Sequence, residues 1–309
     1  MLSNRCNLRC EYCCIPSREG KELSTERCLS ILDEMAAAGT TRVGLLGGEP
    51  LIRSDIHEIV THAKRLGMMV QLYSNGYYVP KKLETIKLLD GLFISVDGPE
   101  DVHDLARGKG SYAAAMAAIQ AARPHVPVFM ISVVTNRSRR HLGYMAELAR
   151  ANDCLVTFQT VTKLGDLSPD VTCLELNDQE LDEVFLELRM LRRENPHVVT
   201  SEAFIEKVLN RRPDQPRDHY QMGSIKCWYG KALANIDADG TVYTCSSLIG
   251  IEQGLNLRDS TFRQAWDHIG STRCQGCNIT CGGEYNVFLS LNPSAVKNVV
   301  RILWRVLRS

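Results

Sequence analysis

Short apolar segments alternate with amphipathic helical segments through the first half of this 309-residue chain, and this alternation limits the folds open to it. Between the apolar segments, apolar residues recur at i, i+3, i+4 and i+7. Short buried strands separated by helices indicate βαβ crossovers and a parallel sheet covered on its outer face. With a further short strand before Cys6, the pattern predicts an α/β fold with six strands, whose other members cover 42–46, 69–73, 92–96, 128–134 and 155–161.

Charge and cysteine content narrow the class of protein. Lys plus Arg and Asp plus Glu number 36 each, so no basic surface predicts binding to nucleic acid. We find no signal peptide and no apolar run long enough to span a membrane, and we therefore expect a cytoplasmic protein. In such a protein, the 12 cysteines indicate metal ligation and not disulfides.

Three of these cysteines form a tight loop near the start of the chain. Cys6, Cys10 and Cys13 have the spacing Cys-x3-Cys-x2-Cys, which lets three thiols converge on one inorganic centre. Zinc prefers four protein ligands, whereas a four-iron cluster held by three thiolates keeps one iron open for chemistry. The alternative is a set of buried or zinc-bound cysteines.

Polar motifs follow the candidate strands at the end where parallel sheets bind ligands. Glu49, directly after two glycines, offers a carboxylate to an ammonium group. Ser95 and Asp97 are two residues apart, so both can point to one side of the sheet. Ordinary loop residues are the alternative explanation for the motifs, which comprise Gly47, Gly48, Glu49, Pro50, Ser74, Asn75, Ser95, Asp97 and Asn136.

Taken in order, the cysteine loop with Tyr12 before its last cysteine, Gly-Gly-Glu at 47–49 and Ser-Asn-Gly at 74–76 resemble the radical S-adenosylmethionine (radical SAM) superfamily. The resemblance implies a partial (β/α)6 TIM-like barrel, a [4Fe–4S] cluster on Cys6, Cys10 and Cys13, and SAM as cofactor. An electron from flavodoxin or ferredoxin would cleave SAM to a 5′-deoxyadenosyl radical.

The resemblance also assigns roles to single residues. Glu49 would hold the SAM amino group, and Ser95 with Asp97 would reach its ribose and carboxylate. Arg107, in a segment that resembles the family's His-x3-Arg-Gly, would pair with the carboxylate, unless it is a solvated arginine at a helix entry. Asn136 is a candidate for adenine or substrate. The expected cofactor contacts are Tyr12, Gly47, Gly48, Glu49, Pro50, Ser74, Asn75, Ser95, Asp97, Arg107 and Asn136.

A second group of cysteines lies near the end of the chain. Cys227 and Cys245, in the pattern Cys-x12-Gly-x4-Cys around a predicted Asp-Gly hairpin turn, resemble the auxiliary-cluster modules called SPASM and twitch domains. Too few cysteines are present for the two-cluster form, so a single cluster on Cys227, Cys245, Cys274 and Cys277 is expected; a zinc ribbon is the alternative. Cys281 is then left over, as a hydrogen donor to a substrate radical, as an inert thiol or as a substitute ligand.

We therefore expect a radical SAM core at 1–165, a helical linker at 166–222, an auxiliary cluster module at 223–286 and a basic amphipathic helix at 287–309. That helix either packs on the barrel, which we favour, or makes a peripheral membrane contact.

Substrate class is the least constrained expectation. Few residues precede Cys6, which leaves no room there for a peptide-recognition domain, so we expect a small-molecule, sugar or lipid-linked substrate. Hydrogen abstraction would lead to epimerisation, dehydrogenation or a related rearrangement by an oxidoreductase or transferase. The alternatives are a peptide-modifying maturase and a sensor that kept the clusters but lost catalysis.

Overall fold

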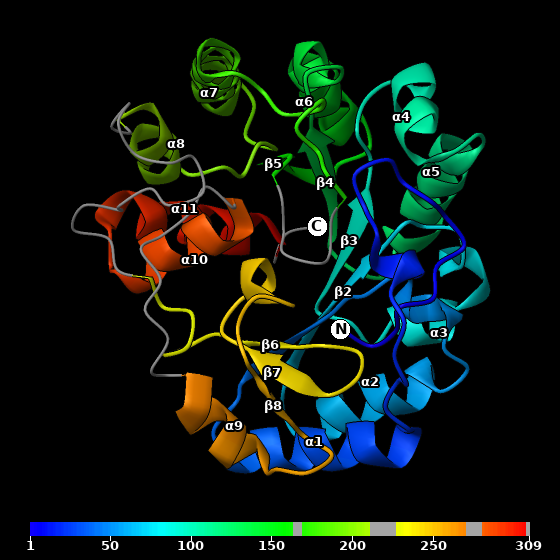
Figure 1. Ribbon diagram of the computed structural model, residues 1–309. Coiled ribbons are helices and arrows are strands. Elements are labelled where there is room, and N and C mark those ends of the chain that lie inside the picture. The colour runs from blue at the N-terminus through cyan, green and yellow to red at the C-terminus, as the bar shows by residue number, and fades with distance from the viewer. Residues whose placement is uncertain (163–168, 211–226, 270–279, 307–309) are drawn as a thin grey trace.

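Five parallel strands, adjacent in chain order, form the curved sheet at the centre of the protein (Figure 1). The structure is a computed structural model that describes residues 1–162, 169–210, 227–269 and 280–306. All four strand pairs are parallel, as the sequence predicts. The strands are β1 (Arg42–Leu45), β2 (Met69–Ser74), β3 (Gly91–Ser95), β4 (Val128–Val134) and β5 (Leu155–Thr160).

Helices cover the convex face of this sheet (Figure 1). Alternate strand residues, such as Leu72 and Ile94, are fully buried against the helices. On the concave face, the half-buried rings of Tyr73, Phe93 and Phe129 stack with centroids 4.4 and 4.6 Å apart. The helices are α1 (Thr25–Ala37), α2 (Ile56–Arg65), α3 (Leu83–Ile86), α4 (Glu100–Arg107), α5 (Ser111–Ala122) and α6 (Leu142–Ala151).

The expected strand before Cys6 is not a regular strand in the described chain. Residues 2–5 run beside the end of β1, where Leu2 N donates to Leu46 O at 2.7 Å and Gly48 N donates to Ser3 O at 2.7 Å. A third contact, from Glu49 N to Arg5 O at 2.8 Å, is the last one before the cysteine loop begins. The partial-barrel prediction is confirmed, with five strands and this short edge segment.

The second half of the chain adds helices and a small antiparallel sheet. Strands β6 and β7 form the predicted hairpin, with Ile236 opposite Val242. The bidentate pair between Arg18 and Asp237, at 3.0 and 2.6 Å, fastens this hairpin to the segment after the cysteine loop. The elements are α7 (Asp178–Glu194), α8 (Glu202–Leu209), β6 (Asn235–Ile236), β7 (Thr241–Tyr243), β8 (Leu255–Asn256), α9 (Phe262–Ile269), α10 (Thr280–Leu289) and α11 (Pro293–Val306).

The last helix, α11, packs on the rest of the protein. Ala295 is buried, and Asn298 Nδ2 donates to Val199 O at 2.8 Å. Its other face leaves Leu303 and Trp304 more than half exposed. No helix among the described residues is long and apolar enough to cross a membrane.

Candidate active site

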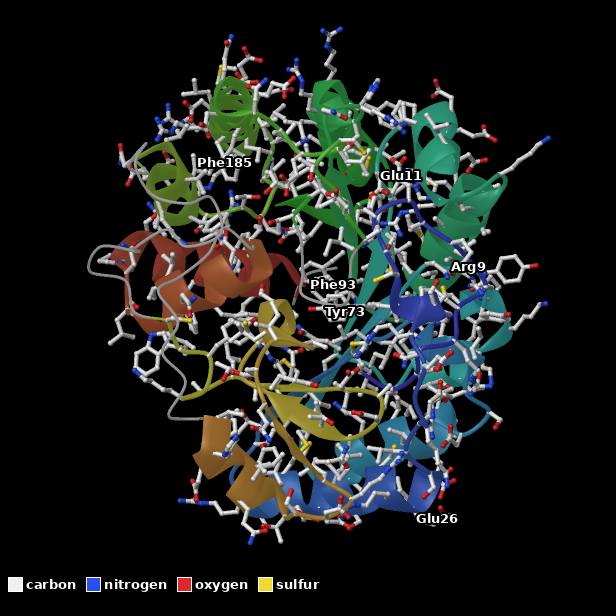
Figure 2. The ribbon with its side chains drawn as sticks, viewed as in Figure 1. Arg9, Glu11, Glu26, Tyr73, Phe93 and Phe185 are labelled. Carbon is white, nitrogen blue, oxygen red and sulfur yellow. The ribbon has the colours of Figure 1, made fainter. Side chains whose placement is uncertain are left out.

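Polar motifs gather at the carboxyl ends of the strands, as predicted. Ser74 ends β2 and Ser95, which is half-buried, ends β3. Asn75 reaches the cysteine loop, because its Nδ2 donates to Asn7 Oδ1 at 2.9 Å and lies 3.7 Å from Cys6 Sγ. Figure 2 shows Tyr73, directly before these residues, in the middle of the barrel.

The three thiols of the cysteine loop are half-buried and lie near enough to affect one another electrostatically. Cys13 N donates to Cys10 O at 3.1 Å, and Cys6 Sγ accepts from Leu8 N at 3.4 Å. Burial, with smaller contributions from the neighbouring Cys10 and Cys6 thiols, raises the pKa of Cys13 to about 11. No group of three or more His, Cys, Asp or Glu side chains in the described parts of the chain could hold a metal ion. Three thiolates from one loop match the ligand set of a four-iron cluster, which binds each thiolate through a different iron.

Glu49 is fully buried at the centre of the site. Its carboxylate accepts from Leu51 N at 3.1 Å, from Asn75 N at 2.8 Å and from the Ser74 hydroxyl at 3.1 Å. Burial raises the pKa of Glu49 to about 7. The carboxylate forms no ion pair with a described residue, so it fits the ammonium group of a ligand.

Gly47 and Gly48, which are expected as cofactor contacts, also lie against the protein's own backbone. A Cβ at Gly47 would overlap the carbonyl oxygen of Ser3, and one at Gly48 would overlap that of Arg5. The chain's own residues 2–5 therefore require glycine at both positions. Pro50 begins the short 3₁₀ helix Pro50–Ile52, which presents the Leu51 N–H to Glu49.

Asp97 and Arg107 contact each other. Arg107 Nε and Nη2 donate to the two carboxylate oxygens of Asp97 at 2.6 and 3.1 Å, and both side chains are buried. Tyr12 Oη donates to Asp97 Oδ2 at 2.5 Å, and Val133 N to Oδ1 at 2.9 Å. The carboxylate thus has four protein donors. The role in SAM binding expected for each residue stays a prediction.

Sequence reasoning missed His103 as a residue of this cluster. Its Nδ1 accepts from Asp97 N at 3.1 Å, and burial lowers its pKa to about 4, so the ring is neutral. The signal was present, since His103 and Arg107 are four residues apart and share one face of α4.

A cavity of about 170 Å³ opens between the cysteine loop, α4 and the end of β4. Asn136 lies beside it, exposed, and its Nδ2 donates to Cys173 O at 2.9 Å. The cavity is lined by Glu11, Tyr12, Asp97, Val102, Leu105, Ala106, Val133, Thr135, Arg137 and Ser138.

The second cysteine group is only partly described. Cys227 is half-buried, and Asn286 Nδ2 lies 3.7 Å from its Sγ; Cys245 directly follows the hairpin. Cys274 and Cys277 lie outside the described residues, as does the side chain of Cys281 at the start of α10.

Residues 1–149 match the family model described as "Radical SAM superfamily". Over these residues the chain belongs to the radical SAM superfamily. Radical SAM proteins use a [4Fe–4S] cluster and SAM, and the loop of Cys6, Cys10 and Cys13 with the buried Glu49 fits both groups.

Curated relatives and solved structures support the same conclusion. The chain is 28% identical over 281 residues to the mycofactocin maturase MftC of Mycolicibacterium smegmatis, covering 86% of this chain and 69% of that protein. In fold it resembles anSMEcpe with bound AdoMet, with a TM-score of 0.68, 16% identity and 97% of both chains covered. It also resembles Streptococcus suis SuiB bound to precursor peptide SuiA, with a TM-score of 0.68, 16% identity and coverage of 94% of this chain and 72% of that one.

These comparisons overturn the expected small-molecule or lipid-linked substrate. That expectation depended on the lack of room for a peptide-recognition domain before Cys6. The fold of anSMEcpe, matched over 96% of both chains, is known with AdoMet and the Kp18Cys peptide bound. A fold of this extent therefore holds a peptide without a further domain, and the expectation was wrong.

Proposed function

We propose that this chain is a radical SAM enzyme that modifies a peptide. The observation that carries the SAM-dependent part is the buried Glu49 carboxylate, which receives only neutral donors beside the three-thiol loop. The peptide follows from the likeness to a mycofactocin maturase and to SuiB with its precursor peptide.

Each part of the site has one task in this proposal. When bound and reduced by one electron, the cluster with SAM supplies the 5′-deoxyadenosyl radical that takes hydrogen from the substrate. Glu49 orients the methionyl ammonium, and Ser74 and Asn75 fix the Glu49 carboxylate. The barrel wall excludes water from the reacting atoms.

The back cysteines belong to the same proposal. Cys227, Cys245, Cys274 and Cys277 would hold a second [4Fe–4S] cluster in a twitch-like module at 223–286, between the linker at 166–222 and the helix from 287 onward. The Asp-Gly hairpin and the Asn286 amide beside the Cys227 thiol support this assignment. Cys281 would then be free to donate hydrogen.

An anaerobic assay tests the proposal. The reconstituted protein receives SAM, dithionite and peptides translated from short reading frames next to its gene, with unrelated peptides of equal length as controls. We expect 5′-deoxyadenosine together with a mass change in one gene-adjacent peptide. Formation of 5′-deoxyadenosine without a mass change in any peptide would contradict peptide modification. If neither 5′-deoxyadenosine nor a changed peptide is formed, the proposal that the chain is a radical SAM enzyme is contradicted.

Cys281→Ala separates the three roles of that residue. If Cys281 donates hydrogen, the variant should keep its iron and form 5′-deoxyadenosine but no longer yield the finished product. Loss of iron would make Cys281 a ligand, and an unchanged product would make it inert.

A further inference from the structure

Tyr12 and Glu11 connect the cysteine loop to α4 at the point where Arg107 is buried. Glu11 N donates to Ala106 O at 3.0 Å, and the Arg107 guanidinium carbon lies 5.4 Å from the centre of the Tyr12 ring. Tyr12 itself stands between Cys10 and Cys13 in the sequence. A full positive charge is therefore held against the loop that carries the cluster ligands.

Asp97, the negative partner of Arg107, is buried as well. Asp97 is 2% exposed and Arg107 is 7% exposed, and the two are joined by a bidentate contact. Both contact Tyr12 of the loop, Asp97 through the Tyr12 hydroxyl at 2.5 Å and Arg107 over the Tyr12 ring. Both charges of the pair therefore lie against the loop that carries the cluster ligands.

Charges in a buried site act strongly, because little water screens them. Reduction adds one electron from a low-potential donor to the cluster, with no bond made or broken. The reduced cluster is more negative, so a nearby cation stabilises it and a nearby anion destabilises it. Net charge and contacts to the ligand sulfurs are known determinants of cluster potential.

We infer that the Arg107–Asp97 pair sets the reduction potential of the cluster on Cys6, Cys10 and Cys13, with Arg107 raising it and Asp97 lowering it. In this role both are positioning residues that act through the cluster ligands. The inference depends on the cluster alone, and it holds whether or not the substrate is a peptide.

The test is a reductive titration followed by electron paramagnetic resonance, without SAM or peptide. The spectrum of a variant with Cys6, Cys10 and Cys13 changed to Ala is subtracted to remove any second cluster. At the potential that half-reduces the parent, Arg107→Gln should lower the ratio of reduced to oxidised cluster about tenfold, which is about 59 mV for one electron.

Opposite signs distinguish this role from a purely structural one. Asp97→Asn should raise the same ratio, Arg107→Lys should stay near the parent, and the double variant Arg107→Gln/Asp97→Asn should also return near it. Arg53→Gln is the matched control: it breaks another buried bidentate pair, with Asp55 at 2.8 and 2.6 Å, and should leave the potential unchanged.

One result would refute the inference on the Arg107–Asp97 pair, and another would refute the proposed function. Equal potentials, or shifts of one sign in both single variants with iron content retained, would refute the inference. Absence of any signal from the three-cysteine loop in the parent would instead refute the cluster site on which the proposed function depends.

Discussion

The Ser74 hydroxyl lies 3.1 Å from each carboxylate oxygen of Glu49, at the end of β2. Together with the Asn75 and Leu51 N–H groups, it fixes an acceptor in a position where no described cation reaches it. In the proposed function, this acceptor is in place for the ammonium of SAM before SAM arrives.

Replacing this carboxylate should weaken SAM binding. We expect Glu49→Gln to raise the SAM dissociation constant about tenfold or more, because a charge-assisted hydrogen bond contributes roughly 1.5–3 kcal/mol. Equilibrium dialysis with the reconstituted protein measures this. Glu22→Gln is the control, since Glu22 is a partly exposed carboxylate that accepts from Ser3. An unchanged constant in Glu49→Gln would remove Glu49 from the SAM site.

SAM binding should also depend on pH. The pKa of Glu49 is raised to about 7 by burial, so the carboxylate loses its charge as pH falls through that value. We expect SAM affinity to drop between about pH 8 and 6 in the parent and to stay nearly level in Glu49→Gln. A parallel drop in both proteins would contradict this assignment.

The same group affects stability with the opposite sign. A raised carboxyl pKa means that the folded protein binds the proton more tightly than the unfolded chain. Without SAM, the free energy of unfolding of the parent should therefore fall relative to Glu49→Gln as pH rises from 4.5 to about 7. Burial also raises the pKa of Glu284 to about 7. Its contribution to the pH dependence of stability is the same in both proteins and cancels in the difference between them.

Iron content tests the two cysteine groups. We expect about eight irons in the reconstituted protein and about four after Cys6, Cys10 and Cys13 are changed to Ala. Cys154→Ala is the control, because Cys154 is buried in the core and its thiol contacts Asn152 O. Iron that is unaffected by the triple change, or zinc in the back group, would refute the corresponding assignment.

Packing of α10 on α8 should be sensitive to a single methyl group. A Cβ at Gly283 would overlap the ring of Phe204, which is fully buried and cannot move aside. We expect Gly283→Ala to lower the free energy of unfolding by about 1–3 kcal/mol. In Gly143→Ala, where no atom lies within 4 Å of the new Cβ, helix propensity should raise it by up to about 1 kcal/mol. Urea unfolding of the two variants measures both; equal effects would contradict the packing described for α10.

The periodic pattern of apolar residues was sufficient to predict most helices and strands of the barrel. The helix at Thr25–Ala37 begins where Ser24 caps it, and the strand at Leu155–Thr160 lies where the apolar run predicts it. The helix α4 was not predicted, because its residues read as a loop motif and not as an apolar stripe. Pro99 before it and the acidic Glu100 in its first turn were the available signals.

Side-chain partners were harder to predict than elements. That Asp97 meets Arg107 depends on α4 turning back over β3, and sequence spacing cannot specify this. The close approach of the backbone to the glycines at 47 and 48 was not predicted, because the residues that approach them are more than forty positions earlier in the chain.

The pair between Arg18 and Asp237 joins positions 219 residues apart. Closing so long a loop is slow and requires the hairpin to exist first. During synthesis, the segment after Cys13 therefore stays without this anchor until the ribosome has passed Asp237, whereas the cysteine loop itself can contact Asp97 and Ala106 much earlier.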